Sequence, residues 1–94
     1  MLRWDSKKPG ETDDRDLDWS LRLDTGDKIT ASTWVVVGSP ASLTVGAHTF
    51  TDTRTKVVLS GGTDAQTYRL QNTITTLLGP SPLIEYVSIE VRDN

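Results

Sequence analysis

The chain has 94 residues, enough for one domain and too few for two. It has no cysteine, so disulfides and thiolate metal sites are excluded, and a small domain without disulfides suits a bacterial or viral protein assembled inside the cell. The net charge of −3 argues against binding to duplex nucleic acid, which needs a basic face.

Residues 1–16 are polar and charged, and Leu2 and Trp4 are their large apolar side chains. This composition predicts a flexible amino-terminal arm without a packed core. An alternative is an arm that becomes ordered on a neighbouring subunit, with Trp4 as its anchor. The segment lacks the apolar stretch of a signal peptide, and no apolar run is long enough to span a membrane. We therefore expect a soluble protein that is made in the bacterial cytoplasm.

From residue 17 onward, apolar residues fall at every second position. Leu17, Trp19, Leu21 and Leu23 alternate with polar residues, which predicts a strand with one apolar face. A turn follows, in which Gly26 supplies a positive φ.

The second predicted strand spans residues 29–37, and its apolar pattern changes phase. Ile29, Ala31 and Thr33 share one face, whereas Trp34 and Val36 lie on the other. Either a β-bulge shifts the register or both faces are partly buried. Gly38-Ser39-Pro40 is expected to end the strand.

Further strands are predicted at residues 42–45, 56–60, 68–75 and 84–92, with a turn at Gly61-Gly62 and no helix. The fold class is therefore all-β: an immunoglobulin-like antiparallel sandwich of six to seven strands over residues 17–94, with a small barrel as the alternative. Tyr68 begins a long penultimate strand after a glycine turn, where immunoglobulin-like folds place a corner tyrosine; an ordinary half-buried strand tyrosine is the other interpretation.

The residues offer little for catalysis. His48 is the single histidine, no Gly-x-Ser-x-Gly motif is present, and one histidine cannot build a transition-metal site. Calcium is an alternative, because carboxylates crowd a short stretch, although their spacing is not that of a calcium loop. These aspartates are Asp13, Asp14, Asp16, Asp18, Asp24 and Asp27. We expect a protein that is not an enzyme, with no cofactor and no small-molecule substrate.

Leu77, Leu78 and Leu83 flank a loop at Gly79–Pro82. Loops of a rigid sandwich are common binding sites, so these leucines are candidate interaction residues together with Trp4. The alternative, which we favour for Leu77 and Leu78, is that they close the end of the core.

Several segments, in order, resemble a family of small tailed-phage or prophage virion proteins described as fiber–tail adaptors or minor structural proteins. They are residues 8–11, 17–20, 26–36, 59–63 and 68–76, and the resemblance extends over residues 7–92. It implies an immunoglobulin-like fold and a non-catalytic role in the particle.

The resemblance transfers fold-defining positions and no catalytic residues. Trp19 and Trp34 are expected to fill the core, and the glycines to supply turns. Asp27 is expected to bind backbone amides in its turn, and Asn72, if buried, must find backbone partners. The complete set is Trp19, Gly26, Asp27, Thr33, Trp34, Gly61, Gly62, Tyr68 and Asn72.

Two functions remain. The first is a virion module in the tail, fiber or head attachment that binds other virion proteins or itself, without nucleic-acid or membrane partners. The second is a carbohydrate- or cell-surface-binding module, which would need exposed aromatic side chains in a shallow groove.

Overall fold

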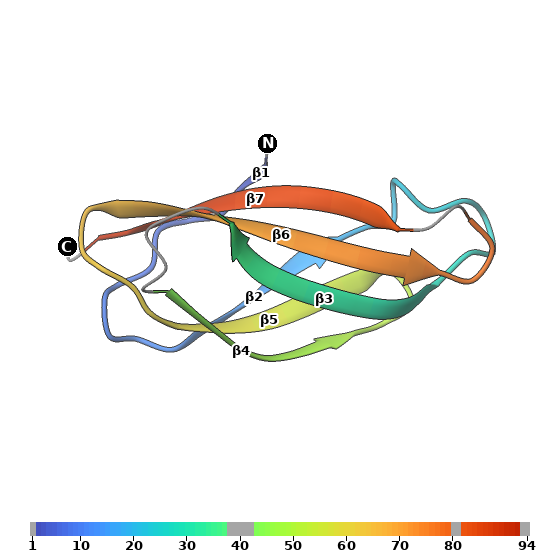
Figure 1. Ribbon diagram of the computed structural model, residues 1–94. Coiled ribbons are helices and arrows are strands. Elements are labelled where there is room, and N and C mark those ends of the chain that lie inside the picture. Colours follow the sequence, from blue (N-terminus) through green and yellow to red (C-terminus); the bar gives the residue numbers. More distant parts are fainter. Residues whose placement is uncertain (1, 38–42, 80–81, 93–94) are drawn as a thin grey trace.

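The computed structural model describes residues 2–37, 43–79 and 82–92, which form a protein of β-strands without a helix (Figure 1). The strands are β1 (Leu2–Arg3), β2 (Asp13–Asp18), β3 (Ile29–Val37), β4 (Leu43–Phe50), β5 (Arg54–Gly61), β6 (Gln66–Thr76) and β7 (Leu83–Val91). One sheet has the order β1-β7-β6-β3 and the other β2-β5-β4. The predicted β-sandwich is confirmed. No strand pairing joins the two sheets in these ranges, so the barrel alternative is wrong.

The strand order is that of an immunoglobulin sandwich. The sheets β2-β5-β4 and β7-β6-β3 correspond to the B-E-D and G-F-C strands of that fold. The strands pair antiparallel except for β1, which runs parallel to β7, and Lys7 forms a further parallel bridge with Val91. The expected end of β3 at Gly38-Ser39-Pro40 lies outside the described residues.

The predicted boundary between an arm over residues 1–16 and a domain over residues 17–94 is wrong. It falls inside β2, which pairs along its whole length with β5, and the chain before it is paired through β1. The pattern concealed β2 because it is an edge strand whose side chains are mostly charged. The carboxylates of Asp14 and Asp16 point outward to Lys56 and Arg54, and Leu17 alone is buried.

The amino-terminal segment, residues 2–8, closes one side of the sandwich. The Trp4 amide donates to Ser88 O of β7, and the Arg15 guanidinium of β2 donates to Asp5 O at 2.8 Å. Lys7 is 1% exposed, and its ammonium donates to Lys8 O at 2.9 Å and to Gly61 O at 2.8 Å. The segment therefore bonds to both sheets.

The Lys7→Ala substitution is expected to loosen this segment and leave the sandwich folded. It removes the hydrogen bond to Gly61 O, together with the buried side-chain stem. Amide hydrogen exchange should accelerate at residues 4–8 and remain slow in β6. Lys8→Ala, at an exposed neighbour, is the matched control. Unchanged exchange in Lys7→Ala would contradict the role of Lys7.

The core lies between the sheets and is mostly apolar. Trp19 and Trp34 are 1% and 5% exposed, and the Trp4 ring packs against that of Trp34 with centroids 5.6 Å apart. The expectation that the two tryptophans fill the core is confirmed. The buried hydrophobic residues are Leu17, Trp19, Ile29, Trp34, Leu43, Val57, Leu59, Tyr68, Leu70, Ile74, Val87, Ile89 and Val91.

Two strand details differ from the simplest reading of the pattern. A bulge between Ile29 and Ala31 shifts the register of β3, which confirms the first of the two alternatives for that strand. The prediction that Leu21 shares the buried face of Leu17 is wrong, because β2 ends at Asp18 and Leu21 is 99% exposed. Asp18 Oδ1 accepts the Ser20 amide at 2.9 Å, and this Asx turn ends the strand.

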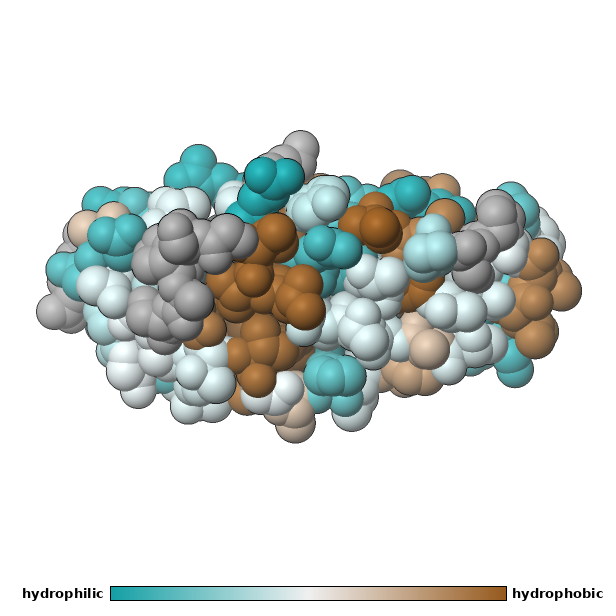
Figure 2. Space-filling view, in the orientation of Figure 1, coloured by the Kyte–Doolittle hydropathy of each residue, from teal (hydrophilic) through white to brown (hydrophobic). Residues whose placement is uncertain are grey.

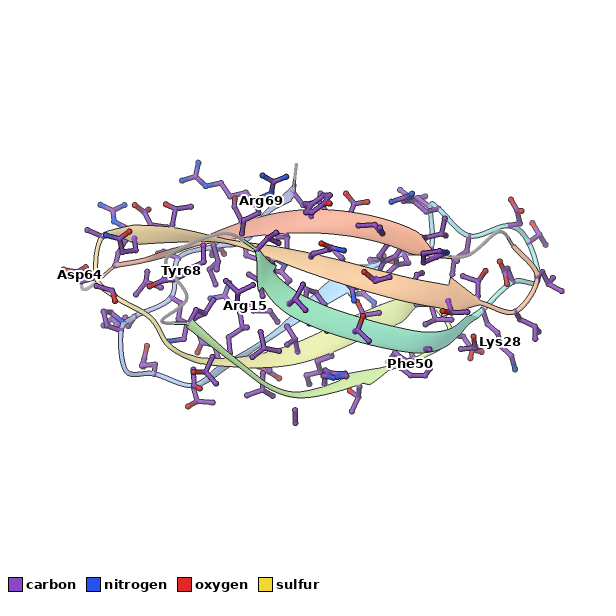
Figure 3. The ribbon with its side chains drawn as sticks, viewed as in Figure 1. Arg15, Lys28, Phe50, Asp64, Tyr68 and Arg69 are labelled. Carbon is purple, nitrogen blue, oxygen red and sulfur yellow. The ribbon has the colours of Figure 1, made fainter. Side chains whose placement is uncertain are left out.

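Tyr68 forms the corner that the sequence suggested. Its side chain is buried, and Thr63 N donates to its hydroxyl oxygen at 2.8 Å across the β5–β6 turn, which also holds Asp64 (Figure 3). Gly62 in this turn has φ +97°, and an added Cβ would lie 2.8 Å from Val91 Cγ2. Gly61 has φ +74°, so both glycines are needed for the turn.

Asn72 joins the two sheets through a buried polar network. Its Oδ1 accepts from Trp19 Nε1 at 2.9 Å and from Thr55 Oγ1 at 2.6 Å. Its Nδ2 donates to Ser32 Oγ at 3.0 Å and to Thr33 O at 2.9 Å. The expected backbone partner is therefore present, and three side chains complete the bonding of the amide.

Candidate interaction surfaces

The outer face of the β2-β5 pair is charged. Asp14 bonds Lys56 at 2.8 Å, and Arg54 contacts Asp16 and Asp18 at 3.1 and 3.5 Å. These groups are about half exposed, so their attraction is screened by solvent and they remain accessible to charges on another protein. The strand register explains the ladder, because Asp16 lies opposite Lys56 and Asp18 opposite Arg54.

The outer face of the β3-β6-β7 sheet has the opposite character. Three successive rows across it contain no charged side chain: Ala31 with Thr75; Thr33 with Thr73 and Ile84; and Val35 with Gln71 and Tyr86. Figure 2 shows a hydrophobic patch over the carboxyl-terminal half of β3 and toward β4. The hydrophobic residues of these strand segments include the exposed Val35 and the half-buried Val36, Val37 and Val45.

A third surface is the end of the sandwich where the loops 19–28, 51–53 and 77–79 meet (Figure 1). Leu21, Leu77 and Leu78 are 99%, 57% and 65% exposed there, and we call this surface the leucine end. The interpretation that Leu77 and Leu78 close the core is therefore wrong. Trp19 and Leu23 of loop 19–28 pack against the core instead, and the Ile29 amide donates to Asp52 O at 2.9 Å.

Asp27 holds the leucine end in shape. Its Oδ1 accepts the amides of Leu78 and Lys28, both at 2.8 Å, so one carboxylate ties loop 77–79 to loop 19–28. The bond to Lys28 is the one expected within its own turn, and the bond to Leu78 adds a second loop. The hydrogen bond from Leu78, followed by that from Lys28, holds the pKa of Asp27 below its ordinary value of 3.8.

Acid is expected to loosen the leucine end. Because the folded pKa of Asp27 is depressed, its ionised form stabilises the fold above the ordinary aspartate pKa, and this contribution is lost as the pH falls through the folded pKa. The carboxyl carbon of Asp27 should titrate by NMR with a midpoint below 3.8, and exchange of the Leu78 amide should accelerate over the same pH range. Asp27→Asn should show fast Leu78 exchange at neutral pH, and Asp24→Asn is the control in the same loop. A midpoint at or above the ordinary value would contradict this role.

The remaining predicted site residues are scattered. Trp4 and Leu83 are half-buried and pack against the core of their own chain, so the alternative in which Trp4 anchors an arm on a neighbour is not the arrangement seen. Gly26 lies in the loop of Asp27 with φ +84°, as expected of a turn glycine, and Thr33 is exposed on β3.

The other aromatic side chains do not gather in a groove. Arg69, on the outer side of β6, lies over the Tyr86 ring at 4.7 Å, whereas Phe50 is on β4 in the other sheet, beside β3 (Figure 3). The part of the surface that the structure describes holds no pocket. Residues 2–37, 43–79 and 82–92 contain no metal-binding cluster of three acidic or histidine side chains, and no helix that could cross a membrane.

Comparison with known families connects this geometry to a role. The family described as podophage GP4 fiber-tail adaptor protein gp77 matches residues 7–83, most of the chain. The chain belongs to this family. No curated protein matches the sequence. The family confirms the resemblance inferred from the sequence motifs, and its members are structural adaptors of the phage particle.

The structure also exposes side chains that the sequence pattern concealed. The exposure of Leu21 was hidden by an apolar alternation that continues past the end of β2, and the signal was Asp18 followed by Ser20, an Asx-turn pair. Leu77 and Leu78 were recognised as candidates, but their position gave no indication that loop 19–28 would cover the core beneath them.

Proposed function

We propose that this adaptor is a non-catalytic module that binds two other virion proteins through chemically different surfaces. The observation that supports it best is the leucine end, where three exposed leucines lie on two loops that Asp27 ties together. Exposed leucines on loops that are already held by hydrogen bonds suit an apolar pocket of a partner, because the loops lose little conformational entropy on binding. Leu77 and Leu78 are the principal interaction residues of this proposal.

The second contact belongs to the charged face of β2 and β5. Asp14, Asp16 and Asp18 alternate there with Lys56 and Arg54, so a partner with a complementary charge ladder would find both signs in a fixed register. An adaptor needs two sites that can be occupied together. The leucine end terminates the sandwich and the charged face runs along its length, so two partners would not exclude each other.

Copurification with the tail and fiber proteins of the same phage tests this function. The Leu77→Ser and Leu78→Ser substitutions should abolish binding to one partner and leave the other bound. Raising the salt concentration should weaken the second contact and spare the first. Matched controls are Thr75→Ser, an exposed position on β6, and the thermal stability of each variant. Retention of both partners by a Leu77→Ser, Leu78→Ser double variant would refute the leucine end as a contact.

A further inference from the structure

The sandwich has four edge strands, β1 and β3 in one sheet and β2 and β4 in the other. An edge strand presents unpaired backbone amides and carbonyls, which bind a further strand unless the edge is short, charged, bulged or covered. The four edges of this protein differ in these features, and the differences single out one of them.

Three of the edges are protected. β1 has only two residues, and β2 has charged residues at five of its six positions. β4 is interrupted in its middle by a bulge between Val45 and His48. The amino-terminal segment also closes the side on which β1 and β2 lie, through the bonds that Lys7 and Arg15 make.

β3 is neither short nor charged, and β4, which lies close to it in the other sheet, forms no strand pairing with it in the part of the chain that the structure describes. β3 is nine residues long, contains no charged residue and no proline, and pairs regularly with β6 from Ala31 to Val37. Its one bulge lies at its start. No described strand pairs with its other edge, and the hydrophobic patch of Figure 2 lies over its carboxyl-terminal half.

The side chains of β3 are complementary to those of a second β3 running in the opposite direction. With Thr33 opposite Thr33 of the partner subunit, Ala31 faces Val35 of the partner subunit, and Ser32 faces Trp34 of the partner subunit. Small side chains then lie opposite large ones on both faces of the strand pair, and a threonine pair, a favourable cross-strand combination, occupies the centre. The net charge of −3 does not oppose this contact, because the meeting edges are uncharged.

We propose that two copies of this chain pair through antiparallel β3 strands about a two-fold axis at Thr33, which joins their β1-β7-β6-β3 sheets into one continuous sheet. The contact is self-complementary, as a two-fold interface requires. It goes beyond the proposed function, because it uses neither the leucine end nor the charged face and leaves both exposed on each copy.

Cross-linking of single-cysteine variants tests the pairing and its register. The natural chain has no cysteine, so Thr33→Cys introduces the single thiol. Directly opposite residues in antiparallel strands have Cα atoms about 4.5–5.5 Å apart, within the range that a disulfide spans. Mild oxidation of the purified protein should give a disulfide-linked dimer of Thr33→Cys. Thr73→Cys, on the next strand of the same face, should remain monomeric on a denaturing gel. Equal dimer yields from the two variants would overturn the register.

A charge exchange provides an independent test. Thr33→Lys and Thr33→Glu each place like charges opposite one another, so each variant alone should sediment as a monomer, whereas their mixture should restore the dimer. Wild type should form dimers in sedimentation experiments over a concentration series. A wild-type monomer at every concentration would overturn the proposal. Because these measurements use the purified chain alone, they are separate from the copurification that tests the adaptor function.

Discussion

Replacing Asn72 with leucine is expected to lower the free energy of unfolding by about 3–4 kcal/mol, although the two side chains have the same branched shape. Asn72 makes four hydrogen bonds at a fully buried position: two to β3 of its own sheet, one to Thr55 of β5 in the other sheet, and one to Trp19 in loop 19–28. Leucine would leave the Trp19 Nε1–H with only the long contact to Thr55. Ser32 Oγ and Thr33 O would lose the hydrogen bonds that Asn72 Nδ2 donates to them. Each buried polar group without a partner destabilises a protein by about 1–3 kcal/mol.

Chemical denaturation monitored by tryptophan fluorescence measures this loss, and Thr55→Val is the matched control. Valine keeps the shape of Thr55 and removes its bond to Asn72 and the long contact from Trp19, while Asn72 retains Trp19, Ser32 and Thr33. The control should lose only about 1 kcal/mol. If Asn72→Leu were no less stable than Thr55→Val, the network would not be what holds the two sheets in register.

The sequence was sufficient to predict the fold class because the core strands alternate clearly. Trp34, Tyr68 and Ile74 lie where period-two spacing places them, and Asn72 stands out as the one polar residue on an apolar face. The same rule failed at the edges of the sandwich. β2 is stabilised by backbone pairing and by outward ion pairs, neither of which depends on apolar spacing. Its charged sequence therefore predicts a solvated arm instead of a strand.

The interaction surfaces could be predicted only in part. Leu77 and Leu78 are candidates because they flank a loop of a rigid sandwich, where binding residues are common. The sequence does not reveal that Leu78 is held by Asp27, 51 residues away in sequence. The sequence does not predict the burial of Lys7, because a lysine is buried only where the fold supplies hydrogen-bond acceptors for its ammonium group. Those acceptors, Lys8 O and Gly61 O, are backbone atoms that no side-chain pattern reveals.

The core tryptophans give the second large effect. Trp34→Ala is expected to lower the free energy of unfolding by about 3–5 kcal/mol, because it empties a buried ring site and removes the packing partner of Trp4.

Substitution of each tryptophan by phenylalanine separates packing from hydrogen bonding. Trp34 Nε1 has no acceptor among the described residues, so Trp34→Phe loses ring volume alone, about 1–1.5 kcal/mol. Trp19→Phe also loses the bonds to Asn72 and Thr55, and it should lose roughly 2 kcal/mol more than Trp34→Phe. Denaturation midpoints of the two variants measure the difference directly. Equal losses would mean that the indole nitrogen of Trp19 contributes nothing beyond packing, and that the polar network does not include it.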